Sequence, residues 1–222
     1  MKKILAMAAG LLLFGAASAQ AQDAPDMMQR VKVMYDLNTL SPKYGDNAYF
    51  NGVGVGYNID FRVSNSLPVY VGTGLDFRAV FHKETIYETG EYDPLNCDVK
   101  TTFLNLNLPV NVSYRVPVAD GFYLTPQLGL DFRVQVYGNA KYENNVIVSD
   151  ELERDLGSYD VNLFSKKEMN GDAMRRFQMG WHAAVNFEYQ QFDLGLSFGT
   201  DFVKIHKNIG GSNFLVSLGY RF

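Results

Sequence analysis

Few side chains in this sequence have the types and the spacing that catalysis requires. The three histidines are His82, His182 and His206, and no serine stands two residues from any of them, as a deacylase-like pair would need. A nucleophile works only with a base within hydrogen-bond distance. His82 and His206 are the pair that could ligate a metal, but loop-proximal histidines are more often simply solvated. The sequence therefore predicts no enzyme, no cofactor and no metal site.

Charged residues recur with a more regular spacing than the histidines. The triplet Asp-Phe-Arg occurs at residues 60–62, 76–78 and 131–133. In a β-strand, residues two apart point to the same face, so each triplet puts an acid and a base on one face and an aromatic ring on the other. This repetition indicates one packing solution that is used several times. The charge network predicted from the sequence comprises Asp60, Arg62, Asp76, Arg78, Arg115, Asp131, Arg133, Arg176, Glu188 and Arg221.

Eight segments position these charges, and in each of them apolar and polar residues alternate. None shows a convincing helical period, so the chain is predicted to be all-β. Short connections alternate strictly with long ones, as in an antiparallel up-and-down β-barrel that spans a membrane. The segments are 30–38, 50–63, 69–82, 101–116, 122–137, 176–190, 192–203 and 213–222.

The two phases of these segments differ in composition. The apolar phase contains residues such as Leu106, Leu128 and Val185 and has neither a charge nor a glycine, whereas the polar phase has nearly balanced acids and bases and many glycines. A barrel of eight strands is just wide enough for its own side chains. We therefore expect the polar phase inside, as a filled and charge-paired lumen without an open channel, and the apolar phase against lipid.

The first residues have the pattern of a secretory signal peptide. Two lysines precede an apolar run that ends in small residues at Ala19 and Ala21. Such a segment is removed after export. Residues 1–21 are therefore predicted to be a signal peptide, cleaved after Ala19 or Ala21, and residues 22–222 a single barrel domain. Cys97 is the only cysteine, which excludes an intrachain disulfide.

The long connections carry most of the negative charge. Residues 83–100 contain five acids and two bases, and residues 139–172 contain eight acids and four bases. The apolar stretches 146–148 and 161–163 are predicted to pair as a hairpin that extends the barrel, and the barrel would have ten strands if that hairpin reached the bilayer. We expect these acidic loops to bind an envelope or extracellular protein. The formal charge of -4, without a basic tract, argues against nucleic acid as a partner.

The final segment, residues 213–222, alternates regularly and ends on an aromatic side chain. A terminal Phe with Tyr two positions earlier resembles the C-terminal assembly signal of bacterial outer-membrane β-barrels. The resemblance implies that Phe222, Tyr220 and Leu218 form this signal and that the barrel assembly machinery recognises it. It also implies a location in the outer membrane of a Gram-negative bacterium, in contact with outer-membrane lipid. We expect the barrel to be a monomer.

Residues 103–115 and 121–130 carry a second resemblance. The first stretch has Pro109 in the middle of an apolar strand, and the second follows a short turn and contains Gly129. This arrangement is similar to the small outer-membrane β-barrel domain family that includes PorT-like proteins. The resemblance implies an integral outer-membrane barrel, with a role in protein secretion or envelope upkeep as one option. Two other functions remain open beside a structural or interaction barrel: a small transport or pore protein, and an outer-membrane lipid-modifying enzyme.

Overall fold

The computed structural model describes residues 25–89, 94–149, 152–206 and 208–222, so the predicted signal peptide lies outside the described residues. In this part of the chain most residues are in β-strands, and no helix is long and apolar enough to cross a membrane. The strands are β1 (Met27–Pro42), β2 (Ala48–Arg62), β3 (Val69–Thr89), β4 (Pro94–Tyr114), β5 (Val116–Ala119), β6 (Phe122–Ser149), β7 (Leu152–Asn162), β8 (Phe177–Tyr189), β9 (Phe192–Val203) and β10 (Ile209–Arg221).

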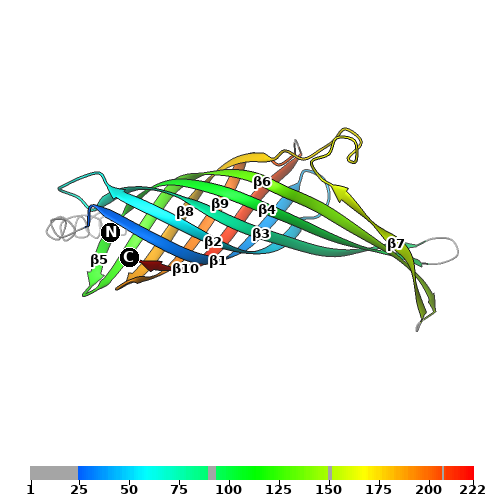
Figure 1. The fold of residues 1–222 in the computed structure, drawn as a ribbon, viewed down its shortest axis with the longest axis horizontal. Helices are drawn as coiled ribbons and strands as arrows, with labels where there is room; N and C mark the ends of the chain where they lie inside the picture. Colours follow the sequence, from blue (N-terminus) through cyan, green and yellow to red (C-terminus); the bar gives the residue numbers. More distant parts are fainter. Residues whose placement is uncertain (1–24, 90–93, 150–151, 207) are drawn as a thin grey trace, which may run out of the picture.

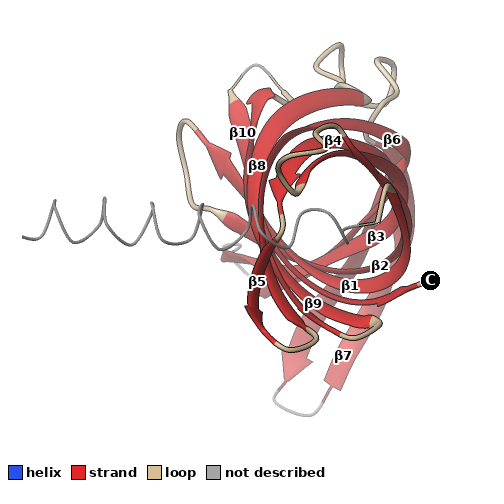
Figure 2. Cartoon of the chain, turned by 90° about the vertical axis from the view of Figure 1, so that its left-hand side faces the viewer, coloured by secondary structure: helices blue, strands red, loops and turns tan. Residues whose placement is uncertain are grey.

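Eight of these strands close into a ring, which confirms the predicted barrel. Neighbouring strands pair antiparallel in the order β4-β3-β2-β1-β10-β9-β8-β6, and β6 returns to β4. Figure 2 looks into this ring from one end. The last strand closes the ring against the first, with Tyr220 opposite Val31. Among the described residues, β5 and β7 pair with β6 alone, so they are not members of the ring.

Three strands are much longer than the ring is tall. β3 runs to Thr89, β4 starts at Pro94 and β6 runs to Ser149, and together with β7 they form a sheet that extends beyond one end of the ring (Figure 1). We call it the protruding sheet, and we call the opposite end, where the carboxyl terminus lies, the short-turn end. The expectation of loops at residues 83–100 and 139–172 is therefore wrong for most of their length. A strand beyond the lipid has no face that must stay apolar, so the alternation that identifies a strand disappears there.

The predicted hairpin forms, but in a different register. Val146 lies opposite Arg154, and Val161 lies opposite Ala140, so the two apolar stretches do not face each other. β6 ends at Ser149, which lies opposite Leu152 at the start of β7, so residues 146 and 147 pair with the first residues of β7. The hairpin belongs to the protruding sheet and leaves the ring at eight strands.

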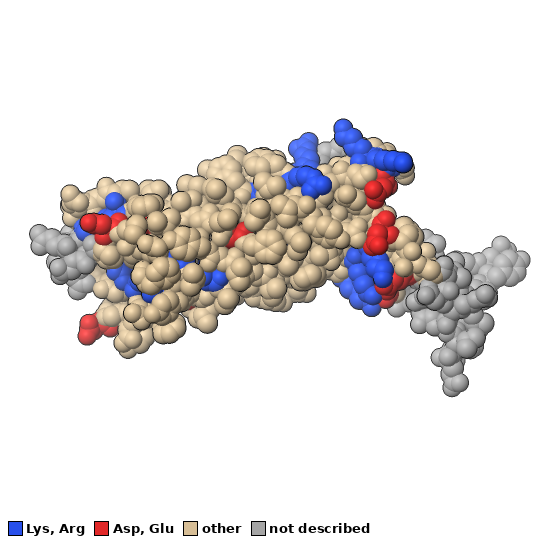
Figure 3. Space-filling view, viewed as in Figure 1, with Lys and Arg blue, Asp and Glu red and all other residues tan. Residues whose placement is uncertain are grey.

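The ring is apolar outside and polar inside. Leu128 and Val53 point outward and are 62% and 57% exposed, whereas Asp76 and Asn107 point inward and are fully buried. The face of the molecule seen in Figure 3 has few charged atoms across its middle zone, and most of its visible charges lie toward the two ends. The predicted orientation of the two phases is therefore confirmed.

Candidate functional site

The lumen of the ring holds charged side chains from most of its strands. Arg30 on β1 contacts Asp60 on β2 at 3.1 Å and Asp193 on β9 at 3.4 Å. All three side chains are buried. One guanidinium group thereby links three strands of the wall.

A second group of charges links β1 to β3. Arg78 contacts Asp36 at 3.3 Å and Asp76 at 3.0 Å, and Lys32 contacts Asp76 at 3.1 Å. Arg78 and both acids are buried. Charges that leave water destabilise a fold strongly unless they are matched, so these side chains stabilise the barrel only as a set.

Glu188 on β8 is the centre of a third group, near the short-turn end. Its carboxylate accepts hydrogen bonds from Arg115 at 2.7 Å, from Thr125 at 2.7 Å and from Arg221. The guanidinium carbon of Arg115 also lies 3.4 Å from the centre of the Tyr123 ring, which adds a cation–π contact. This group connects β8 to β6 and β10.

A fourth group lies nearer the protruding sheet. His182 Nδ1 is 2.9 Å from Asp131 Oδ2, and Arg133 contacts Asp201 at 3.3 Å. Arg133 also donates a hydrogen bond of 3.2 Å to Asn107. These contacts connect β6 to β8, β9 and β4.

Glycines face the lumen carboxylates across the strand pairs. Asp76 lies opposite Gly56, and Asp60 lies opposite Gly72. A Cβ atom added at Gly56 would lie 2.2 Å from Asp76 Oδ1, and one added at Gly72 would lie 2.0 Å from Asp60 Oδ1. Each of these two carboxylates occupies the space that a side chain of its partner would need, which explains the glycines at positions 56 and 72. Further Asp–Gly partners are Asp36 and Gly52, Asp131 and Gly180, and Asp193 and Gly219.

The lumen also contains a polar cavity of ≈ 60 Å³ between the charge groups. Asn58, Asn111 and Asn186 line it, and each of these buried amides has one atom without a hydrogen-bond partner among the described residues. A polar space of this size accommodates a few water molecules, which are the partners that such amides need. The cavity is therefore suited to internal water rather than to a larger solute.

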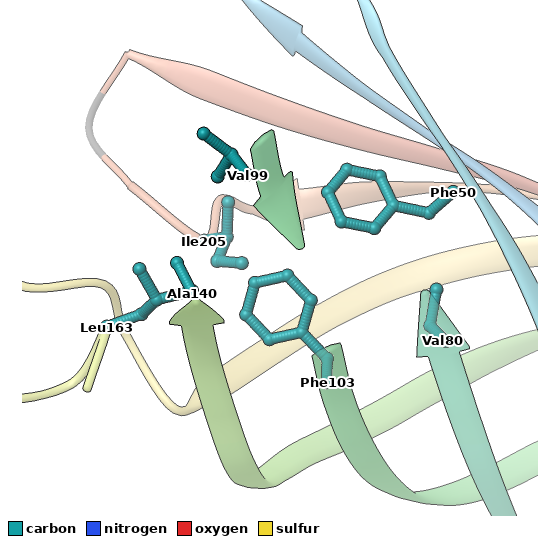
Figure 4. Close-up of a cluster of buried hydrophobic side chains, with 7 residues drawn as sticks. All are labelled: Phe50, Val80, Val99, Phe103, Ala140, Leu163 and Ile205. Carbon is teal, nitrogen blue, oxygen red and sulfur yellow. The ribbon is translucent and has the colours of Figure 1, made fainter. Parts of the chain in front are cut away.

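Between the charge groups and the protruding sheet, an apolar cluster lies in the lumen of the ring. The side chains come from the walls of the barrel and from the connections after β7 and β9, and they converge on one another (Figure 4). The Phe50 and Phe103 rings lie 5.8 Å apart, and Phe164 lies 6.5 Å from Phe103. We call this cluster the apolar plug; its members are Phe50, Val80, Val99, Phe103, Ala140, Leu163 and Ile205.

The apolar plug was not predicted, although the sequence contains a signal for it. Phe50, Val80 and Phe103 all stand in the phase that points into the lumen, and each interrupts its polar pattern. Antiparallel pairing brings them to a similar height, since Val80 lies opposite Phe103. Apolar residues in the inner phase near one end of several strands therefore indicate a closed mouth.

The structure brings most of the predicted charge network into these groups, with two members elsewhere. Arg62 donates hydrogen bonds to the carbonyl oxygens of Ser64 and Asn65 in the turn after β2. Arg176 donates to the carbonyl oxygens of Gln135 and Val136. Charged residues of the lumen that the predicted network omits are Arg30, Lys32, Asp36, Asp193 and Asp201. The network also omits His182, which lies beside Asp131.

Two residues of the predicted assembly signal lie on the outer face of β10, and the third, Phe222, directly follows the strand. Leu218, Tyr220 and Phe222 are 56%, 40% and 64% exposed, and the backbone N–H of Phe222 donates to the carbonyl oxygen of Gln29 at 3.2 Å. The Tyr220 ring meets the Phe192 ring edge-on at 5.5 Å. These aromatic groups gather at the short-turn end of the apolar surface, and their role in assembly stays a prediction.

The three histidines are distributed over separate environments. His82 contacts the carbonyl oxygen of Tyr49, and His206 Nε2 lies 3.0 Å from Asp172 Oδ1. Among the described residues, no set of three or more His, Cys, Asp or Glu side chains is arranged to hold a metal ion. His82 and His206 each have their own neighbours, so the geometry gives no support to a shared site.

The outward face of the protruding sheet carries paired charges. Lys83 contacts Asp98 at 2.8 Å, and Lys100 contacts Glu143 at 2.6 Å. The hydrogen bond from Lys83 lowers the pKa of Asp98, and the hydrogen bond from Lys100 lowers the pKa of Glu143. Both carboxylates therefore stay ionised at neutral pH, and lysines offset part of the acidic charge of this region.

Comparison with known proteins gives one family match. Residues 7–222 match the family model described as the outer membrane protein beta-barrel domain. A search of curated proteins finds no match.

Several solved structures have a similar fold at low sequence identity. Ail, the attachment invasion locus protein of Yersinia pestis, is 13% identical with a TM-score of 0.41, and the alignment covers 89% of this chain and 100% of that chain. Neisserial surface protein A is 10% identical with a TM-score of 0.40, covering 89% and 98%. OprG of Pseudomonas aeruginosa is 9% identical with a TM-score of 0.37, covering 90% and 96%. Likenesses this distant carry no functional information.

Proposed function

Because the chain belongs to the outer membrane protein beta-barrel domain family, we propose that it is a closed, non-enzymatic barrel whose protruding sheet binds another protein at the cell surface. The protein is located in the outer membrane of a Gram-negative bacterium. Outer-membrane barrels have short turns on the periplasmic side and longer connections outside. The protruding sheet is accordingly assigned to the outer surface.

The apolar plug is the observation that carries the proposal. Phe50 and Phe103 from the barrel wall meet Leu163 and Ile205 from the connections, and all four side chains are buried. A hydrophobic constriction excludes water and therefore blocks hydrated ions. Below it, the lumen is occupied by paired charges and contains a small polar cavity. Transport would require both layers to rearrange, which favours an interaction role over a pore.

The surface of the protruding sheet supports the second half of the proposal. Ile86 is 43% exposed and Tyr159 is 53% exposed, although both lie beyond the ring. The Tyr159 ring stacks on Tyr142 at 4.9 Å with an interplanar angle of 5°. Exposed aromatic and apolar groups outside the lipid are typical of protein-binding surfaces.

Planar-bilayer recordings test whether the barrel is closed. The unmodified protein is expected to give no porin-sized conductance steps after refolding and insertion. A known porin inserted under the same conditions is the positive control. Regular steps of porin size would contradict the closed barrel and would favour the transport alternative.

Site-specific photo-crosslinking in living cells tests the interaction role. A photoreactive residue at Ile86 or Tyr159 is expected to form adducts with a protein, whereas the same residue at Leu128 on the lipid-facing surface is not. The Leu128 variant also controls for expression and membrane insertion. Equal adduct formation at all three positions, or none at the protruding sheet, would refute a protein-binding role for this surface.

A further inference from the structure

The protruding sheet has two outer edges, because its strand order is β3-β4-β6-β7. β2 follows β3 only as far as Asn51 opposite Phe81, while β3 continues to Thr89 in register with β4. At the other edge, β7 pairs with β6. Within the described ranges, no further strand pairs with either edge. The edge of a sheet presents N–H and C=O groups that another strand can use.

The two edges differ in their regularity. The ladder between β6 and β7 has register shifts between Glu143 and Asn145 and between Ile147 and Ser149, and Gly157 in β7 has a φ of 103°. Such irregularities twist an edge and prevent further pairing. The ladder between β3 and β4 has no register shift along its length. The edge of β3 is therefore the one whose backbone remains suited to strand addition.

His82 marks the point where this edge begins. Its Nδ1 atom lies 2.6 Å from the carbonyl oxygen of Tyr49 on β2, and its ring lies 4.7 Å from the Phe50 ring. The imidazole thus contacts a backbone carbonyl oxygen of β2 at the point where β2 and β3 separate. Beyond it, the side chains of Lys83 and Glu84 are 59% and 62% exposed. Neither face of the strand is therefore covered at these two side chains, and no described strand pairs with this side of β3 beyond Phe81.

We propose that residues 82–89 of β3 bind an extended segment of another protein, which adds to the protruding sheet as a strand. The inference rests on the proposed interaction function and specifies where and how the partner binds. The added strand would lie in line with β2, beyond Ala48, where β2 begins. Backbone hydrogen bonds would supply affinity, and alternate side chains would supply specificity.

The side chains beside this edge indicate the sequence pattern of the partner. Ile86 lies opposite Cys97, which packs against the apolar plug, so Ile86 points toward the barrel mouth. Lys83 and Thr85 point to the other face, where they contact Asp98. A partner segment in which apolar and polar residues alternate would place its apolar side chains beside Ile86 and its polar side chains beside Lys83 and Thr85.

A peptide copied from β4 is a defined probe for this edge. β4 already pairs with β3 from the other side, so a synthetic peptide of residues 95–103, with serine in place of Cys97, has side chains that suit the register. At millimolar concentration it is expected to slow amide hydrogen exchange about tenfold in residues 83–89 of the refolded protein. Failure to slow exchange there, or slowing in β7 instead, would overturn the proposal.

Proline variants separate edge binding from general damage. Successive residues of a strand direct their N–H groups alternately to the two neighbouring strands. Of the variants Glu84→Pro and Thr85→Pro, one therefore removes an N–H that points to the free edge, and the other removes an N–H that bonds to β4. The first of these variants leaves the hydrogen bonds to β4 intact. The variant that keeps the β4 hydrogen bonds is identified by unchanged amide hydrogen exchange at Val99 and Lys100. In this variant the peptide is expected no longer to slow exchange in residues 83–89. Ser158→Pro on β7 is the matched control and should leave the slowing by the peptide unchanged. Full peptide protection in the ladder-retaining variant would contradict the proposal.

The peptide and crosslinking experiments fail independently. Protein adducts at Ile86 and Tyr159 without peptide protection at β3 would preserve the interaction function and exclude the edge as its site. If the peptide slows exchange at β3 but no protein adduct forms in cells, the edge can accept a strand but the proposed interaction function is refuted.

Discussion

At the scale of single residues, the lumen acids depend on partners from other strands. Within the Asp-Phe-Arg triplets, Asp76 contacts Arg78 of its own triplet, but Asp60 contacts Arg30, and Asp131 contacts His182. The triplets therefore predicted the location of these charges and not their pairing. Pairing depends on which strands meet across the lumen, and sequence spacing does not contain that information.

The opposition of Asp and Gly leads to a prediction for Gly56→Ala. The new Cβ would approach Asp76 Oδ1 within 2.2 Å, so the carboxylate must move away from Lys32 and Arg78. We expect a loss of about 1–3 kcal/mol in the free energy of unfolding, as for other overpacked interiors. Urea unfolding in lipid vesicles, followed by the fluorescence of the single tryptophan, measures it. Gly210→Ala on β10, where an added Cβ would lie 4.0 Å from its nearest neighbour, the carbonyl oxygen of Ser41, tests the effect of the Ala substitution without the clash.

Glu188→Gln tests the charge group near the short-turn end. The substitution keeps the shape of the side chain but leaves Arg115 and Arg221 without their shared carboxylate. Because an unmatched buried charge is costly, we expect a loss of about 3–5 kcal/mol in the same unfolding assay. Glu143→Gln on the protruding sheet, where the side chain is 27% exposed, is the matched control and should change stability much less. Equal effects of the two substitutions would show that the lumen charges are solvated.

At the scale of the strand, alternation predicted the barrel wherever one face meets lipid. It located all eight ring strands and their orientation, because lipid and lumen impose opposite demands on neighbouring residues. It failed for the outer halves of β3, β4 and β6, where both faces meet water or the mouth of the barrel. It also failed at Phe50 and Phe103, where an inward apolar residue packs against connections whose position no strand pattern specifies.

The orientation of the strands leads to a prediction for Leu128→Arg. This side chain is 62% exposed on the outer face of β6 and lies opposite Ala183 on β8, within the apolar surface. An arginine near the middle of a bilayer costs roughly 2 to 4 kcal/mol. Equilibrium unfolding in vesicles should show this loss, whereas Tyr44→Arg in the connection after β1 should not. Unchanged stability of Leu128→Arg would contradict the assigned outer face.

At the scale of the whole molecule, ring size explains why the barrel is closed. Eight strands enclose a space that their own side chains fill. Glycines then make room for the carboxylates, and the apolar plug fills the end toward the protruding sheet. The molecule therefore offers more surface outside the ring than space inside it. The sequence could predict the ring from its period, but the protruding sheet and its free edge depend on pairing between distant segments.

Closure of the ring also leads to a prediction for Phe222→Ala. β10 completes the barrel by pairing with β1, and the exposed Phe222 follows its last residue, Arg221. If assembly machinery recognises this aromatic end, the substitution should reduce the fraction of heat-modifiable protein in the outer membrane several-fold, while export and signal cleavage persist. Refolding of the purified variant into vesicles should be nearly normal, because a single exposed side chain contributes little to stability. Phe202→Ala, which removes an aromatic side chain that is 50% exposed on β9, is the matched control for Phe222, which is 64% exposed. An equal assembly defect in both variants would attribute the effect to lost lipid contact and not to recognition of the terminal strand.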